Sequence, residues 1–272
     1  MNWGKQCCVI MCWSVMVTMT HLETAWASDL TSDEWQFTVA PYVWAVGMDG
    51  EVGLAGVKTS VNDNFIDIME DSDSVVAFMG DFSAWKGPWA VFVSPTWAKL
   101  GKDDESFGPN KADVTETITI IGFGMKYRLA DWSLAEAPGG SAAWVNQRFT
   151  FDLLAGGRYT HLKTELDFKG LGTRDKSNDW VDPFVGAVTQ IGLTDKLSFR
   201  VRGDVGGFGV GSDLSLHSVG LLVYTVRPFE LYGTLFAGYR ALYQDYTNGS
   251  GSNKFEWDMT LHGPMLGLAV TF

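Results

Sequence analysis

Arginines and acids at alternating positions are the residues of this 272-residue chain best suited to do chemistry. Within 197–208, Ser198, Arg200, Arg202 and Asp204 alternate with apolar residues, and 148–159 and 229–245 repeat the arrangement. Successive residues of a β-strand point to opposite faces. One wall of a sheet should therefore carry these charged candidates: Arg148, Asp152, Arg158, Asp182, Arg200, Arg202, Asp204, Glu230 and Arg240.

A second group of polar residues is acidic and lies between 62 and 74: Asp63, Asp67, Glu70, Asp71 and Asp73. Oxygen ligands of this type suit Ca²⁺, but EF-hand spacing is absent. We expect a solvated acidic loop and no metal site, with an external module for cations or a partner as the alternative. Phe65, Ile66, Ile68 and Met69 have helical spacing, which predicts a short amphipathic helix near 64–70 that plugs an interior or lies over its mouth.

Catalytic chemistry has weaker support. His217 and Ser218 are adjacent, and adjacent strand residues face opposite sides, so they cannot form a dyad by themselves. His161 and His262 belong to other segments, and no G-x-S-x-G motif is present. We assign no catalytic residue and no cofactor. A lipid-modifying enzyme is kept as an alternative function.

The first 27 residues have the layout of a secretory signal. Lys5 precedes an apolar run from Cys7 to Met19, and Ala25 and Ala27 give small-residue spacing before a cut. We expect a signal peptide at 1–27 and one domain at 28–272. All three cysteines fall within the signal, which excludes disulfides and thiolate metal sites from the mature chain. The net charge of −12 argues against nucleic-acid binding, which needs a basic stripe.

The elements that must position the charges are strands. We predict strands at about 35–46, 50–61, 75–86, 89–100, 113–129, 147–164, 179–192, 197–208, 214–226, 230–246 and 255–272. A bilayer-crossing strand needs about 9–11 residues, and aromatic residues gather at strand ends as in interface girdles. The predicted fold is all-β, a single antiparallel transmembrane β-barrel. An even strand number is required, so we predict about 12 strands, with 10 as the alternative and the N-terminal third as the doubtful region.

Turn lengths give the orientation. Residues 86–88, 193–195 and 226–228 form short turns, whereas 101–112, 165–178 and 247–254 are longer and polar. Short periplasmic turns and longer external loops are typical of outer-membrane barrels. The pattern therefore places the three short turns inside and the three long loops outside.

Several motifs resemble a group of uncharacterised proteobacterial outer-membrane β-barrel proteins. They are Ala40 to Gly50, Gly156 to Tyr159, Asp179 to Gly186, Arg202 to Asp213, Gly238 to Arg240 and His262 to Pro264, and they span nearly all of the mature chain. The resemblance implies a single outer-membrane barrel and no particular activity. The stretch from Leu134 to Val145 departs from the pattern, because it is longer than an inner turn.

These observations predict a bacterial outer-membrane protein. It would be a narrow, porin-like pore or a structural component with a charge-lined lumen. Rings of charge can select solutes, but buried charges must be paired, and small barrels have filled interiors. We therefore favour a filled or nearly filled lumen. The expected partners are outer-membrane lipid and lipopolysaccharide, with small solutes in the pore version; the sequence does not define the oligomeric state.

Overall fold

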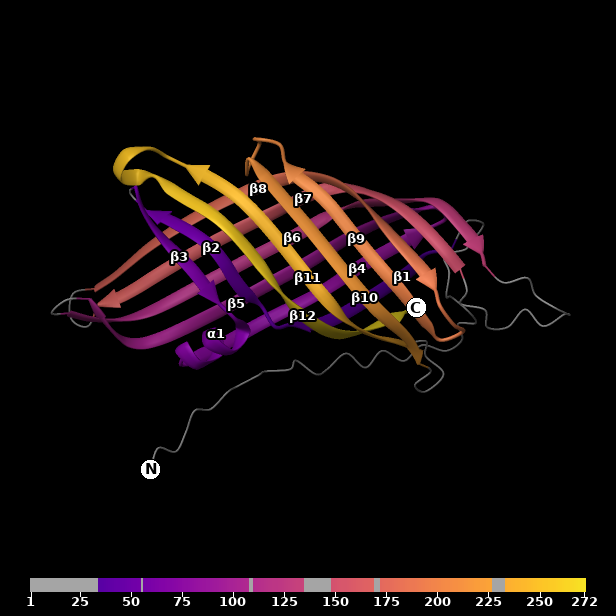
Figure 1. Ribbon diagram of the computed structural model, residues 1–272, viewed down its shortest axis with the longest axis horizontal. Helices are drawn as coiled ribbons and strands as arrows, with labels where there is room; N and C mark the ends of the chain where they lie inside the picture. The colour runs from indigo at the N-terminus through magenta and orange to yellow at the C-terminus, as the bar shows by residue number, and fades with distance from the viewer. Residues whose placement is uncertain (1–33, 55, 108–109, 135–147, 169–171, 227–232) are drawn as a thin grey trace, which may run out of the picture.

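The architecture is an antiparallel β-barrel (Figure 1), seen in a computed structural model that describes residues 34–54, 56–107, 110–134, 148–168, 172–226 and 233–272. The strands are β1 (Gln36–Trp44), β2 (Gly47–Leu54), β3 (Val57–Asp63), β4 (Ser74–Lys86), β5 (Trp89–Phe107), β6 (Asn110–Ser133), β7 (Arg148–Phe168), β8 (Gly172–Gly192), β9 (Leu197–Gly207), β10 (Leu214–Val226), β11 (Gly233–Asn248) and β12 (Phe255–Thr271). The proposed signal at 1–27 lies outside the described residues.

Ten of these strands close the barrel, in the order β1-β4-β5-β6-β7-β8-β9-β10-β11-β12 with β12 pairing back onto β1. The remaining two, β2 and β3, form a hairpin beside β12. The described chain therefore has twelve strands, of which ten close the barrel and two form the hairpin beside it. The prediction of an all-β barrel is confirmed.

The N-terminal third explains the odd strand count that the sequence pattern predicts. β1 pairs with the last part of β12, from Met265 to Thr271, while β2 pairs with its first part, from Phe255 to His262. The predicted strand at 50–61 is wrong, because β2 ends at Leu54 and the chain runs back beside it as β3 from Val57. Two short strands thus share the edge of one long strand.

Two of the predicted long loops are also largely wrong. β5 and β6 run to Phe107 and from Asn110, and β7 and β8 run to Phe168 and from Gly172. Most residues of 101–112 and 165–178 therefore belong to strands and not to loops. These extensions of β5 to β8 project beyond the other strands of the barrel (Figure 1). At 247–254, by contrast, β11 ends at Asn248 and a short 3₁₀ helix occupies Gly251–Asn253.

We call the end of the barrel that carries the β2–β3 hairpin and the β9–β10 turn the tip end. The end where Phe37 and Phe272 exchange backbone hydrogen bonds is the terminal end. The β9–β10 turn is tight, and Gly207, Phe208 and Gly209 all have positive φ there. Glycine adopts this backbone conformation without steric cost, which accounts for the glycine-rich run at this turn.

The polarity of the two wall faces reverses along the strands. The outward residues of β6 are apolar toward the terminal end (Ile121, Phe123, Met125, Tyr127 and Trp132) and polar toward the tip (Asp113, Thr115, Thr117 and Thr119). On β12 the outward residues Leu266, Leu268 and Val270 give way to Glu256, Asp258, Thr260 and His262. On these long strands the outer surface is therefore an apolar belt toward the terminal end and polar toward the tip. The shorter strands β9 and β10 keep apolar outward residues up to their turn, among them Val205, Leu214 and Leu216.

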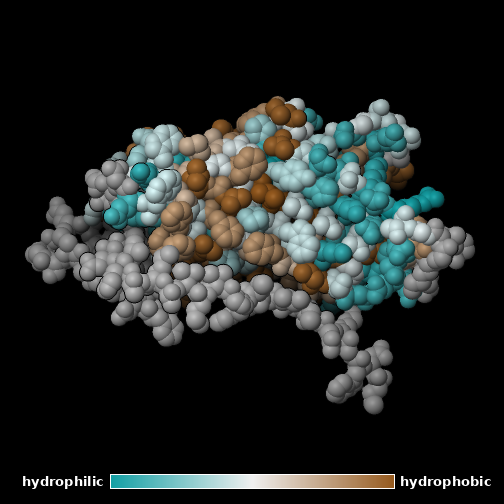
Figure 2. Space-filling model, turned by 180° about the vertical axis from the view of Figure 1, so that it is seen from behind, coloured by the Kyte–Doolittle hydropathy of each residue, from teal (hydrophilic) through white to brown (hydrophobic). Residues whose placement is uncertain are grey.

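The interior shows the opposite order. Buried Phe255, Trp257, Met259 and Leu261 line the tip half of β12, and charged residues such as Asp152 and Arg158 line the terminal half of β7. Figure 2 shows the outer surface from one side, with hydrophobic residues over the middle and hydrophilic residues gathered toward the tip end. The barrel is thus divided into two halves with different surfaces and different interiors.

The predicted short helix is confirmed as α1 (Phe65–Asp71). Asn64 caps it by accepting from the backbone N–H groups of Ile66 and Asp67, and the Asp67 carboxylate accepts in return from Asn64 N–H. This reciprocal arrangement is a capping box. α1 lies against β2 and β3, and its Phe65, Ile68 and Met69 border the interior space of the tip half.

Within the described residues, no helix combines the length and apolar character needed to cross a membrane.

Candidate functional site: the barrel interior

The interior contains two cavities, one in each half. The cavity in the tip half has a volume of about 850 Å³, and the one in the terminal half about 290 Å³. Tyr42 and Ile120 line both, so the layer that contains them separates the two spaces. The side chains of this layer decide whether the barrel is open from end to end.

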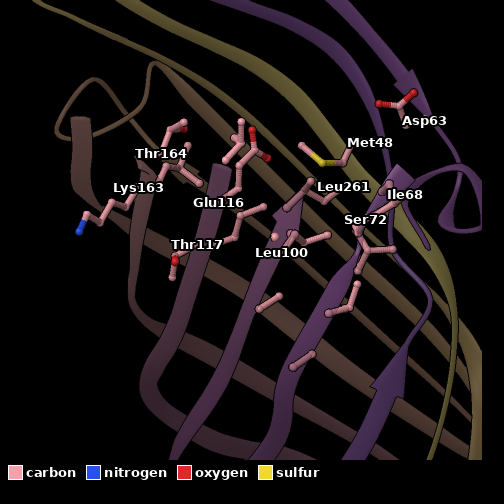
Figure 3. Close-up of a pocket in the computed structure, with 18 of the residues that line it drawn as sticks. Met48, Asp63, Ile68, Ser72, Leu100, Glu116, Thr117, Lys163, Thr164 and Leu261 are labelled. Atoms are coloured by element: carbon pink, nitrogen blue, oxygen red, sulfur yellow. The ribbon is translucent and has the colours of Figure 1, made fainter. Parts of the chain in front are cut away.

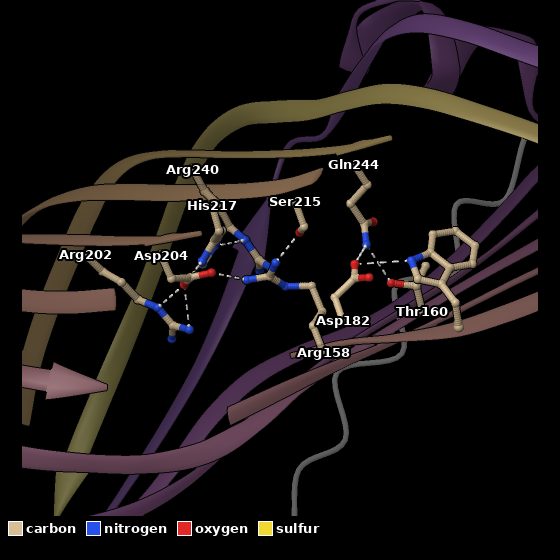
Figure 4. A network of polar contacts seen from close by, with 10 residues as sticks. Arg158, Thr160, Asp182, Arg202, Asp204, Ser215, His217, Arg240 and Gln244 are labelled. Atoms are coloured by element: carbon tan, nitrogen blue, oxygen red, sulfur yellow. Dashed lines mark hydrogen bonds and ion pairs between the residues drawn. The ribbon is translucent and has the colours of Figure 1, made fainter. Parts of the chain in front are cut away.

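Asp204 of β9 is the centre of the separating layer (Figure 4). Its carboxylate accepts hydrogen bonds from Arg158 and from Arg202 Nε at 3.0 Å, and it contacts His217 Nδ1 at 3.0 Å. The Asp204 side chain has no solvent exposure, and that of Arg158 is only 3% exposed. A buried carboxylate is stable only when paired, and here three strands supply the partners.

Arg240 of β11 extends this cluster across the barrel. Its Nε donates to His217 Nε2 at 3.1 Å, and its Nη1 donates to the Tyr42 hydroxyl at 2.8 Å and to Thr96 Oγ1 at 3.3 Å. The guanidinium also lies 4.3 Å from the centre of the Trp44 ring. β1, β5, β10 and β11 are thereby joined through one side chain in the middle of the interior.

A second cluster lies nearer the tip and is centred on Asp182 of β8. Its carboxylate accepts from Trp180 Nε1 at 3.2 Å, from Gln244 Nε2 at 3.0 Å and from the backbone N–H of Ser212 at 2.6 Å. The Ser212 contact ties the β9–β10 turn to the wall of the barrel. Asp182 is fully buried, and these three donors to its carboxylate are all neutral groups.

A third group lines the cavity in the terminal half. Arg128 donates to Asp152 at 2.8 Å, Arg148 lies 2.7 Å from Asp131, and Arg200 donates to Gln190 at 2.9 Å. Lys126 also points into this cavity. The lining of the terminal half is therefore rich in cations and partly ion-paired.

Eight of the nine charged residues singled out in the sequence belong to strands that place them in these three interior groups. Glu230 lies outside the described residues. The structure adds interior members that the sequence pattern did not identify: Asp81, Lys126, Arg128, Asp131, Gln190 and His217. Most of them lie on the same faces as their predicted neighbours. A strict two-residue count along β6 would have found Lys126 and Arg128.

The acidic residues of 62–74 do not converge. Asp67 caps α1, Asp73 accepts from the backbone N–H of Asp103, and Asp63 lines the tip cavity. Glu70 and Asp71 lie on exposed positions of α1. No group of three or more acidic, His or Cys side chains able to hold a metal ion occurs within the described ranges.

The histidines lie in separate environments. Both ring nitrogens of His217 are engaged, by Asp204 and Arg240, so neither is free to act as a general base. Ser218 points outward on the same strand. His161 and His262 lie outside the barrel, next to Tyr159 and Tyr239 respectively. This arrangement provides no nucleophile–base pair among these residues.

The tip cavity has an apolar wall (Figure 3). The inward side chains of nine strands contribute, and among them are Trp44, Met48, Val52, Leu100, Ile118, Leu162, Trp257 and Leu261. Glu116 of β6 stands among these apolar groups, between Leu100 and Thr164 in the strand register. Burial raises the pKa of the Glu116 carboxyl. The tip cavity is thus suited to an apolar ligand.

Glu116 gives a pH-dependent prediction. Its raised pKa means that the carboxylate destabilises the folded barrel once the pH exceeds the unfolded-state pKa. Glu116→Gln should therefore raise the Tm of the purified protein at about pH 8, with a smaller difference from the parent at about pH 4, where both side chains are neutral. A difference that is equal at the two pH values would show that the carboxyl is fully hydrated.

The fold and its interior define a class: an antiparallel, ten-stranded β-barrel with a paired polar layer across its middle. Two solved structures of Ail, the attachment invasion locus protein of Yersinia pestis, are similar. One is in complex with the heparin analogue sucrose octasulfate; it has 12% identity and a TM-score of 0.38, covering 88% of this chain and 98% of Ail. The other has 10% identity and a TM-score of 0.34 over the same shares of the two chains. No family model and no curated protein matches the chain.

Proposed function

We propose that the chain is an integral protein of the bacterial outer membrane, with the terminal half in the bilayer and the tip half outside. The apolar belt supports this proposal. On β6 the belt runs from Ile121 to Trp132, which suits the roughly 9–11 residues of a bilayer-crossing strand. A wide apolar surface exposed to water would promote aggregation, whereas a bilayer covers it.

We propose further that the barrel is a closed, structural and ligand-holding module and not a diffusion pore. The observation that carries this is the layer of Arg158, Asp204, His217 and Arg240, whose side chains are all buried and joined to one another. An open pore needs a continuous water path, and its polar lining would then be solvated. Within the described interior, the larger cavity is apolar and lies outside the proposed bilayer.

Planar-bilayer recording tests the closed lumen. The purified protein should show no single-channel steps in about 1 M salt, because a sealed layer blocks ions at any salt concentration. Steps of conductance in the unmodified protein would contradict the proposal and favour the narrow-pore alternative.

A matched pair of variants tests whether the layer of Arg158, Asp204, His217 and Arg240 is the barrier to ions. Arg240→Ala removes the side chain that spans from His217 to Tyr42 and should introduce conductance. Arg200→Ala removes a cation that lines only the terminal cavity and should leave the recording silent. Equal conductance in both variants would place the barrier elsewhere.

The geometry gives less support to an enzyme acting on lipid. Both ring nitrogens of His217 are engaged, and the outward-facing His161 and His262 lie beside the tyrosines Tyr159 and Tyr239. We therefore keep this function only as the alternative that the sequence suggested, and an altered lipid A profile in a deletion strain would be needed to revive it.

A further inference from the structure

The barrel wall has a seam in its tip half. β1 and β4 pair from Gln36 with Trp85 up to Pro41 with Gly80, and their ladder ends there. Above this point β4 continues to Ser74 with only β5 as its partner, and β3 pairs only with β2. Between β3 and β4 no strand pairing closes the wall within the described residues.

The tip cavity reaches the outer surface at this seam. Its lining includes the inward-facing Trp44 and Met79, and also Val43 and Val76, which point outward from β1 and β4. Val43 is 62% exposed and Val76 is 41% exposed. Because residues of both wall faces border the same space, the cavity opens sideways between β3 and β4. Ile68 and Met69 of α1 border the same opening.

The seam lies at the border of the apolar belt. On its β1 and β4 side, the outward residues Val43, Val76 and Phe78 are apolar and continue the belt. On its β3 side, the outward residues are Lys58, Ser60 and Asn62, which are polar. Unpaired strand edges are too costly to face hydrocarbon, so the unpaired edges of β3 and β4 must lie at the level of hydrated head groups. The opening therefore faces the region where lipid head groups meet their chains.

We propose that the seam admits one acyl chain of an outer-leaflet lipid, which lies in the tip cavity while its head group stays at the seam. This inference rests on the membrane placement proposed above. A cavity of about 850 Å³ is large enough for a bulky apolar ligand. Its mouth is continuous with the apolar belt, so a chain can enter without crossing water. The layer of Tyr42, Thr96 and Arg240 forms the floor and stops the chain from passing into the terminal half.

Photocrosslinking in bilayers tests this inference. The probe is a phosphatidylethanolamine with a diazirine at the end of one acyl chain, mixed into vesicles that contain lipopolysaccharide. After irradiation, labelled residues are identified by mass spectrometry. We expect labels on the cavity-lining Met48, Leu100 and Leu261 as well as on the belt residues Leu266 and Leu268. Labels confined to outward residues would overturn the inference.

The belt labels separate this inference from the membrane placement. If Leu266 and Leu268 are labelled but no inward residue is, the barrel spans the bilayer and only the lipid-binding cavity is wrong. If neither set is labelled, the membrane placement itself is wrong. A parallel reaction supplies a free diazirine fatty acid from water. Inward labelling by the fatty acid but not by the lipid would overturn lateral entry from the bilayer.

A filling variant provides the matched control. Ala98 and Ala77 face each other on β5 and β4, and both line the cavity. Ala98→Trp should reduce inward labelling by about tenfold, because the indole takes space that the chain needs and a clash of about 1–3 kcal/mol lowers binding on that order. Ala237→Trp adds the same volume on the exposed outer face of β11 and should leave inward labelling unchanged. Ala77→Trp replaces Ala98→Trp if the latter does not fold; inward labelling that survives filling would overturn the proposed path.

Discussion

Asp204→Ala is expected to lower the free energy of unfolding by about 3–5 kcal/mol, the usual cost of removing one partner from a buried ion cluster. The carboxylate is fully buried and is the shared acceptor of Arg158, Arg202 and His217. Without it, the two guanidinium groups face each other inside the barrel with no counter-charge. Urea unfolding of the protein folded into phospholipid vesicles, followed by tryptophan fluorescence, measures the loss.

The control is an ion pair on the surface of the tip half. Asp175 lies 3.8 Å from Lys163, and its side chain is 59% exposed. Asp175→Ala should cost less than about 1 kcal/mol, because exposed pairs are hydrated and screened. A similar loss of unfolding free energy in the two variants would mean that the Asp204 cluster is hydrated. That result would contradict the proposal of a closed lumen.

Met125→Arg is expected to have the second largest effect, a loss of about 2–4 kcal/mol when the barrel is in a bilayer. Met125 points outward from β6 and is 50% exposed in the middle of the apolar belt. A charged side chain at this depth must leave water for hydrocarbon. The same vesicle-based unfolding experiment measures the cost.

Thr117→Arg is the matched variant, because Thr117 lies on the same strand and the same face but in the polar tip half. We expect a change of about 0–1 kcal/mol, as found near or beyond the membrane interface. A penalty at Thr117 as large as that at Met125 would show that the bilayer covers the tip half as well, and the division into two halves would be wrong.

The strand pattern predicted the barrel because alternation is a local property of the sequence. Arg200, Arg202 and Asp204 needed only their neighbours to be assigned to one face. The helix at Phe65–Asp71 was predictable for the same reason, since its apolar spacing lies within one segment. The faces and element types that short segments determine were therefore accessible from the sequence.

The closure of the barrel was not accessible in this way. The break between β1 and β2 and the return of β3 depend on β12, about two hundred residues further along the chain, which pairs with both strands at once. A pattern within one short segment cannot reveal a strand partner that lies so far along the chain. This long-range pairing produces the seam between β3 and β4 and the opening of the tip cavity, which is why both were visible only in the structure.

The reversal of polarity was present in the sequence but was not identified. On β6 the outward series changes from Thr115, Thr117 and Thr119 to Ile121 and Phe123. Alternation alone does not reveal this change, because the period is two on both sides of it. The two halves could have been located by asking, at each end of a long strand, whether the apolar residues occupy the odd or the even positions.

The most direct test of the two-half barrel is a depth profile along one strand. Once Cys7, Cys8 and Cys12 are replaced by serine, the chain has no other cysteine. Single cysteines at Thr115, Thr117, Thr119, Ile121, Phe123 and Met125 can then each carry a spin label in vesicles. The account predicts that collisions with a water-soluble nickel reagent dominate up to Thr119 and that collisions with oxygen dominate from Phe123 onward. Collisions with the nickel reagent that dominate at all six positions would contradict it.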